Sequence, residues 1–238
     1  MKKVFLKIIN LFYPITCSSC GKDLISTSQT RICGRCKSSF SFINGHICQI
    51  CGKLLSSGGE LCYVCKKNPK GRKFDKMRSV YEYKDSVRKL ILKFKYSNRT
   101  FLAKDFAADM YETMKNNDFY QTSEFIISVP LNIIRKIKRG YNQSELLADE
   151  LSIKANIPVL KNVLFRKKIT KPQFKLSRAE RFENIKNSFF VKSKEVIAGK
   201  NILLIDDIIT TSSTLSACSS VLKSCGVDKI FVLTLARD

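Results

Sequence analysis

The sequence predicts an α/β protein in which a doubly wound parallel sheet follows a small cysteine-rich module. Two observations carry this prediction. From residue 77 onward, strand-like and helical stretches alternate, as in a parallel sheet covered on both faces. Near the N-terminus, eight of the ten cysteines form four CxxC pairs within 49 residues. We therefore expect two domains, residues 1–70 and 71–238, separated by a linker at Asn68-Pro69-Lys70-Gly71.

The chain is strongly basic along its whole length. Its 238 residues include 43 Lys+Arg and 20 Asp+Glu, a formal net charge of +23, of which residues 1–70 carry +9 and residues 71–238 carry +14. This excess fits a surface that binds a polyanion, and equally a protein from a lysine-rich proteome. With 44% hydrophobic and 26% charged residues, the composition excludes a disordered or membrane-embedded chain.

The apolar residues among the first twelve recur at helical spacing, which predicts a short amphipathic helix packed on the body of the protein. A signal peptide fits less well, because Lys7 interrupts the apolar stretch and Pro14-Ile15-Thr16 lacks the small residues of a cleavage site. No apolar run approaches the roughly 18 residues of a membrane-spanning helix. We therefore expect a cytoplasmic protein.

The four CxxC pairs have the spacing of metal sites. Two thiolates three positions apart can hold one side of a tetrahedral zinc ion, and two pairs complete a site. The first two pairs are separated by 12 residues and the last two by 10, enough for a hairpin arm in each case. We interpret them as two consecutive zinc ribbons, each with one structural Zn²⁺; interleaved pairing is the alternative. The expected ligands are Cys17, Cys20, Cys33 and Cys36 in the first ribbon and Cys48, Cys51, Cys62 and Cys65 in the second.

The role of these ribbons is open at this point. A region so poor in aliphatic residues needs metal to fold, and a structural platform without catalysis is the simplest interpretation. Basic residues among the cysteines would also suit a nucleic-acid platform. The only histidine, His46, is expected to be a loop residue, because four thiolates already complete each site.

The second part of the chain alternates strands with helices. We expect strands over residues 77–83, 125–129, 202–205 and 229–235, and helices over residues 86–95, 101–115 and 144–156 and in the segment leading to Cys225. The basic residues Arg135, Lys136, Lys138 and Arg139 are expected in a turn after the second strand, close to a polyanion. Further along, residues 161–181 are rich in Lys and Arg and fit either a solvated loop or a mobile lid.

The most informative stretch follows the apolar strand at residues 202–205. Asp206 and Asp207 come at its carboxyl end, where doubly wound sheets bind ligands. A helix then begins after a run of small hydroxyl residues, and its free amides and hydroxyls suit a phosphate. The two carboxylates suit the hydroxyls of a ribose, directly or through Mg²⁺. We call this run the hydroxyl loop; it consists of Thr210, Thr211, Ser212, Ser213 and Thr214.

This stretch resembles the phosphoribosyl-pyrophosphate motif of the phosphoribosyltransferase superfamily, in which four apolar residues, two acids and two apolar residues precede a Thr/Ser/Gly loop. Ser212 stands where that motif usually has Gly. The motif Arg139-Gly140-Tyr141-Asn142-Gln143, preceded by Val129-Pro130-Leu131 and Arg135, looks like the "RGFNQ" signature of the ComF family. A further block, from Arg166 through Gln173 to Asn184, resembles that family as well. With the ribbons, the resemblance covers nearly the whole chain.

The resemblance implies a type I phosphoribosyltransferase fold and a role in bacterial natural transformation. It further implies binding of single-stranded DNA at the cytoplasmic side of the membrane, with a DNA-uptake helicase or membrane channel as a partner. By the same resemblance, Asp206 and Asp207 would bind the ribose and Mg²⁺ of phosphoribosyl pyrophosphate, the hydroxyl loop its 5′-phosphate, and Arg135 and Arg139 its pyrophosphate. Asp206, Asp207 and Arg139 are the expected catalytic residues.

Whether the protein catalyses a transfer is open. A nucleotide-salvage phosphoribosyltransferase is one alternative, against which the two ribbons count. A non-catalytic scaffold that senses its ligand is another. It is favoured by Ser212 if that position requires positive φ or close approach of the backbone to phosphate, where a residue other than Gly would cost about 1 kcal/mol.

Overall fold

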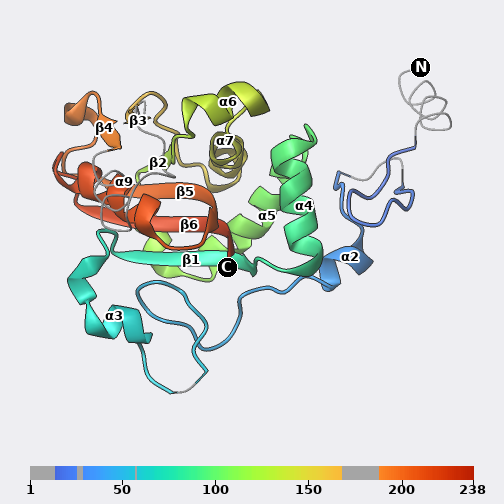
Figure 1. Ribbon diagram of the computed structural model, residues 1–238, viewed down its shortest axis with the longest axis horizontal. Coiled ribbons are helices and arrows are strands. Elements are labelled where there is room, and N and C mark those ends of the chain that lie inside the picture. The colour runs from blue at the N-terminus through green and yellow to red at the C-terminus, as the bar shows by residue number, and fades with distance from the viewer. Residues whose placement is uncertain (1–13, 26–28, 57, 168–187) are drawn as a thin grey trace, which may run out of the picture.

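The computed structural model describes residues 14–25, 29–56, 58–167 and 188–238 (Figure 1). The helix predicted over the first twelve residues, and most of the basic segment 161–181, lie outside these ranges. The helices are α2 (Gly34–Ser38), α3 (Tyr63–Lys67), α4 (Asp85–Tyr96), α5 (Leu102–Lys115), α6 (Ile133–Arg139), α7 (Gln143–Ala155) and α9 (Ser213–Lys223), with short 3₁₀ turns η1 (Pro69–Gly71), η2 (Asp118–Thr122) and η4 (Lys194–Val196). The strands are β1 (Lys76–Glu82), β2 (Phe125–Ser128), β3 (Leu164–Arg166), β4 (Phe189–Val191), β5 (Asn201–Ile209) and β6 (Lys229–Arg237).

Four of the strands form one parallel sheet in the order β1-β6-β5-β2, and β3 and β4 form a small antiparallel pair beside it. The parallel sheet confirms the α/β fold predicted from the alternating pattern. Its central strands β5 and β6 have mostly buried residues and, within β5, a half-buried stretch at Asp206, Asp207 and Ile208, as expected for parallel strands that are covered on both faces. The crossover helices give the chain a doubly wound topology.

Each face of the sheet has its own buried cluster, because successive side chains of a strand point to opposite faces. On one face, Leu203 and Ile205 of β5 pack with apolar residues of α4, α5 and α7. On the other face, Ile202 and Leu204 pack with α9, with β3 and β4, and with the four cysteines of the second ribbon. The second ribbon is therefore part of the core of the sheet domain.

Strand β5 is longer than predicted. The sequence favours an end at residue 205 because two acids follow, but the backbone continues to pair with β6 through Ile208 and Ile209. Asp206 and Asp207 therefore lie within β5, near its carboxyl end, and the hydroxyl loop follows the strand. Backbone pairing in a sheet does not depend on side-chain polarity, which is why a polarity pattern misplaces such an end.

Both ribbons contact β1, one of the two edge strands of the sheet. In the first ribbon, Ile43 N donates to Val80 O (2.9 Å), and Glu82 N donates to Ser41 O (2.9 Å). In the second, Met77 N donates to Ile50 O (2.7 Å). The short helices α2 and α3 accordingly lie near opposite ends of β1 (Figure 1). The predicted boundary between residues 70 and 71 stays a prediction. Among the described residues, no helix is long and apolar enough to cross a membrane.

Candidate functional site

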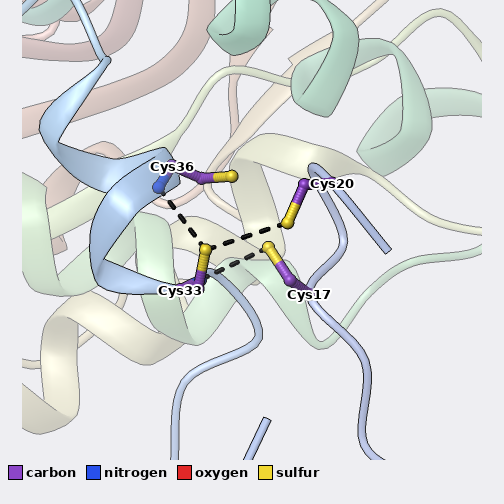
Figure 2. Close-up of side chains that lie close together, drawn as sticks. All are labelled: Cys17, Cys20, Cys33 and Cys36. Atoms are coloured by element: carbon purple, nitrogen blue, oxygen red, sulfur yellow. Dashed lines mark hydrogen bonds between the residues drawn. The ribbon is translucent and has the colours of Figure 1, made fainter. Parts of the chain in front are cut away.

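The eight N-terminal cysteines form two separate clusters, and they pair consecutively. Cys17, Cys20, Cys33 and Cys36 make the first cluster, shown in Figure 2, and Cys48, Cys51, Cys62 and Cys65 make the second; within each, the sulfur atoms lie within 4.8 Å of one another. Two sulfur pairs are separated by 3.9 Å (Cys20–Cys33) and 3.7 Å (Cys51–Cys62). Four sulfurs about 2.3 Å from one tetrahedral Zn²⁺ would lie about 3.8 Å apart, so the donor sets fit zinc. The interleaved alternative is wrong.

Each ribbon begins with a tight turn that aims backbone N–H groups at its first sulfur. Burial raises the pKa of Cys17, but hydrogen bonds from the N–H groups of Cys20, Cys33 and Ser19 outweigh it and lower the pKa to about 6. Cys48, at the same place in the second ribbon, has its pKa lowered to about 6 in the same way. His46 lies outside both clusters, and its Nε2 donates to Gly59 O (2.6 Å), as expected for a loop residue.

The two clusters differ in their surroundings. All four cysteines of the second are buried, whereas in the first Cys20 is exposed and Cys33 and Cys36 are partly buried. Two arginines approach the second cluster: Arg72 Nε donates to Cys65 Sγ (3.2 Å), and Arg237 donates to the backbone oxygen of Cys51. A Cys₄ site with Zn²⁺ carries a net charge of −2, so the two guanidinium groups balance the buried site.

A second kind of site lies at the carboxyl ends of the parallel strands, as doubly wound topology predicts. Here a cavity of about 300 Å³ brings together residues that are far apart in the sequence. Six of the predicted site residues line it: Arg135, Arg139, Asp206, Asp207, Thr210 and Thr214. A small hollow of about 50 Å³ beside it is lined by Thr211 and Ser212 as well. Ser213 lines neither; its hydroxyl lies 3.1 Å from that of Thr211.

The two acids at the floor of this cavity have different partners. Asp206 Oδ1 accepts hydrogen bonds from Ser144 Oγ (3.0 Å) and from the backbone N–H of Asp207 (2.8 Å). Burial, and then the charge of Asp207, nevertheless raises the pKa of Asp206 to about 7. Asp207 Oδ2 forms an ion pair with Lys95 Nζ at 2.9 Å. A bound cation or diol would favour the ionised form of Asp206.

In the middle of the hydroxyl loop, Ser212 has an unusual backbone conformation. Its φ of 26° lies in the region that favours glycine, consistent with the Gly that the resembling motif usually has there. Ser212 is the N-cap residue of α9, yet its hydroxyl makes no capping hydrogen bond. Instead, that hydroxyl accepts a hydrogen bond from Nη1 of Arg72. At the start of α9, the Ser213 N–H donates to Thr211 O, so the next amides, those of Thr214 and Leu215, are the ones that can bind an anion.

The basic segment after β2 is the helix α6, and the predicted turn is wrong. Asn132 caps the helix by accepting from Ile134 N (2.9 Å), and Gly140 ends it in the left-handed conformation. Four residues apart on this helix, Arg135 and Arg139 share one face and both line the cavity. Lys136 instead pairs with Glu145 (3.2 Å), and Lys138 does not line the cavity. Two of the four predicted cations therefore face it.

Five polar residues that the sequence did not mark as site residues also line the cavity: Tyr83, Lys95, Asn142, Ser144 and Arg166. Lys95 comes from the end of α4, and no local pattern connects it with Asp207. Ser144 follows directly after the Arg-Gly-Tyr-Asn-Gln motif, and this position could have marked it as a site residue. Arg166 of β3 closes the wall; its Nε is buried without a hydrogen-bond partner among the described residues. Cations from the three elements α4, α6 and β3 thus surround the two acids.

A second cavity of about 350 Å³ adjoins the first and shares Pro130, Leu131 and Arg166 with it. Its walls come from α6, α7 and β3, and they include Phe165 and Glu145. A partly apolar space with a few polar groups is the usual form of a small-molecule site.

Known proteins resemble this chain over nearly its whole length. Family models match residues 8–66 as a double zinc ribbon domain and residues 106–238 as a phosphoribosyl transferase domain. Competence protein F of Haemophilus influenzae is 34% identical over 95% of this chain and 98% of its own length. Competence protein ComFC of Bacillus subtilis is 30% identical over 78% of this chain and 75% of its own length. The DNA utilization protein YhgH of Salmonella typhimurium is 26% identical over 87% of this chain and 96% of its own length.

Among solved structures, a glutamine phosphoribosylpyrophosphate amidotransferase from B. subtilis aligns with a TM-score of 0.42 at 16% identity, covering 60% of this chain and 30% of that chain. The fold assignment rests on the family models and on the strand order.

Proposed function

The chain belongs to the ComF family of competence proteins, and we propose that it binds phosphoribosyl pyrophosphate with Mg²⁺ in the 300 Å³ cavity and single-stranded DNA on its basic surface. In this proposal the protein acts during DNA uptake at the cytoplasmic side of the membrane, with a DNA-uptake helicase or membrane channel as its partner. The observation that carries the ligand proposal is one cavity that joins two acids, a hydroxyl loop and two arginines.

The charges of the cavity match the parts of the ligand. The amides and hydroxyls of the hydroxyl loop suit the 5′-phosphate, and Asp206 and Asp207 lie beside the loop, where the ribose hydroxyls would follow. Arg135 makes no hydrogen bond or ion pair with any described residue, so its guanidinium is available for a pyrophosphate. Arg139 lies 4.7 Å from the ring of Tyr96 and donates to its hydroxyl (2.8 Å), which fixes its direction.

If the protein is a transferase, these residues suffice without a protein nucleophile. The bond between C1 of the ribose and pyrophosphate would break, the electron pair would leave with the pyrophosphate, and an acceptor would then bond to C1. Mg²⁺, when bound, would offset the charge that develops on the pyrophosphate. Arg135 and Arg139 would stabilise the same charge, and the acids would stabilise the positive ribosyl centre. The adjoining cavity is the nearest space for an acceptor.

Binding of single-stranded DNA is supported by the net charge of +23 and by relatives named for competence and DNA utilization. Binding driven by phosphate contacts weakens with salt by about 0.7 log units per contact and per tenfold salt change. We expect that salt dependence, with little preference for base sequence, in fluorescence anisotropy with labelled oligonucleotides. No binding at low salt would exclude this part of the proposal.

Calorimetry with phosphoribosyl pyrophosphate and Mg²⁺ tests the ligand. We expect wild type to bind and Asp207→Asn to bind at least about tenfold more weakly, a loss of about 1.4 kcal/mol. The matched control is Asp118→Asn, which removes an exposed acid in η2 and should bind like wild type. Wild type without measurable binding, or equal binding by Asp207→Asn, would overturn the ligand assignment.

Two alternatives make different predictions in the same assays. A nucleotide-salvage phosphoribosyltransferase would release pyrophosphate with one of the free nucleobases, and Asp207→Asn would abolish the release. A non-catalytic scaffold would bind the ligand and release none with any base. The positive φ of Ser212 supports the scaffold, because the backbone at the phosphate position holds strain that a catalytic loop with Gly would not have.

A further inference from the structure

Arg72 connects the second zinc cluster to the hydroxyl loop. It lies between η1 and β1, and its guanidinium contacts two groups that are remote in sequence. Its Nε donates to the sulfur of Cys65 (3.2 Å), and its Nη1 donates to the hydroxyl of Ser212. A guanidinium is planar and rigid, so it transmits the position of one partner to the other.

The Ser212 end of this bridge needs a support. A serine at φ 26° is unfavourable unless surrounding contacts hold it, and its hydroxyl does not cap α9. The contact that its side chain does make is with Arg72. Without that contact, the loop would relax toward a conformation with negative φ, and the amides at the start of α9 would turn away from the cavity.

The Cys65 end of the bridge is fixed by its surroundings. Cys65 is buried with the other three ligands of the second cluster and with Phe74, whose ring lies 5.8 Å from the Arg72 guanidinium. A thiolate that ligates Zn²⁺ has a fixed position and is a strong acceptor for a charged donor. Among the described residues, the first cluster has no such link: the polar contacts of its ribbon with helices go to α4 and α5, and none reaches the hydroxyl loop.

We propose that Arg72 is a positioning residue for the hydroxyl loop, held by the zinc-bound thiolate of Cys65 and holding Ser212 in its ligand-binding conformation. The second ribbon is then a structural part of the ligand site, although none of its cysteines lines the cavity. This inference rests on the proposed function for what the loop binds, and on the structure alone for what holds the loop.

The test compares Arg72→Met with Arg237→Met. Both variants remove one arginine from the same zinc cluster, but only Arg72 contacts the hydroxyl loop. We measure zinc by elemental analysis, amide hydrogen exchange over residues 210–216 without ligand, and affinity for phosphoribosyl pyrophosphate with Mg²⁺. We expect two zinc ions in each variant. Loop exchange should be at least about tenfold faster, and affinity about tenfold weaker, in Arg72→Met alone.

A double-mutant cycle with Ser212→Gly tests whether Arg72 acts on the conformation of Ser212 or stabilises the region in general. Because Gly adopts positive φ without strain, the effect of Arg72→Met on loop exchange should fall below about threefold in the Ser212→Gly background. Unchanged exchange in Arg72→Met, or an equal change in Arg237→Met, would overturn the inference. If wild type does not bind the ligand, the proposed function fails, and the exchange comparison still decides the role of Arg72.

Discussion

The two zinc ribbons have the same ligands and nearly the same spacing, but they attach to the sheet domain in opposite ways. The first is exposed at Cys20 and is held through acids of α5: Arg31 N donates to Asp105 (3.0 Å), and Lys37 pairs with Asp109 (2.5 Å). The second is buried, and arginines from the sheet domain contact its thiolates and backbone. The same CxxC motif can therefore form a ribbon on the surface of the domain or one within its core.

The charge of a Cys₄ zinc site explains the difference. In the exposed first ribbon, water screens the charge of −2, and the basic residues around it are free to bind acids of α5. In the buried second ribbon, the charge needs compensation from cations, and Arg72 and Arg237 provide it. The first ribbon is thus docked on the domain, whereas the second is built into it.

Removing one ligand from each ribbon should give the largest contrast. We expect Cys51→Ser to lower the free energy of unfolding of the whole sheet domain by more than about 3 kcal/mol, because zinc binding supplies folding energy to a cluster inside the core. Cys20→Ser should unfold the first ribbon but leave the unfolding transition of the sheet domain largely unchanged. Calorimetric melting with zinc analysis measures both. Equal losses would show that the ribbons are equivalent.

The first turns of the two ribbons provide a second matched pair. Gly21 (φ 77°) and Gly52 (φ 64°) follow equivalent cysteines, but a Cβ at Gly52 would lie 2.7 Å from Met77 O, whereas one at Gly21 would meet nothing within 4 Å. Gly21→Ala should cost about 1 kcal/mol of backbone strain. Gly52→Ala should cost about 2–4 kcal/mol, because β1 must also move. Urea unfolding measures both; similar values would mean that the second turn can move away from β1.

The smallest effect concerns Asp105, which accepts from the first ribbon. Burial raises its pKa above the unfolded value, despite the hydrogen bond from Arg31 N–H. The folded state therefore holds this proton to higher pH than the unfolded chain, and the associated stability is lost as pH rises through the folded pKa. Asp105→Asn keeps an acceptor without charge.

We expect this variant to gain stability relative to wild type as pH rises above about 3.8, the ordinary pKa of the carboxyl, by at most about 1 kcal/mol in urea unfolding. A loss at pH 7.5 would show that the negative charge itself anchors the first ribbon. Asp118→Asn, on the surface, controls for general charge effects.

The sequence predicted what short spacing and periodicity encode. The CxxC pairs, the buried strands and the acids before the hydroxyl loop are local signals, and each was found. The helix α6 could also have been predicted from the sequence, because Asn132 and Gly140 are its start and stop signals. The density of positive charge suggested a turn instead. Lys95 and Arg72 were not predictable, because their partners Asp207 and Ser212 become neighbours only when the sheet assembles.

The contact of residues 41–43 with β1 has a consequence for the newly made chain. An outer strand presents unpaired N–H and C=O groups, which can recruit a strand from another molecule. Here the first ribbon satisfies part of that row through Val80 and Glu82. A chain whose first ribbon has not yet bound zinc would leave these N–H and C=O groups of β1 unpaired. We expect such chains to aggregate during synthesis in zinc-depleted cells, even though we expect the first ribbon to contribute less than the second to equilibrium stability.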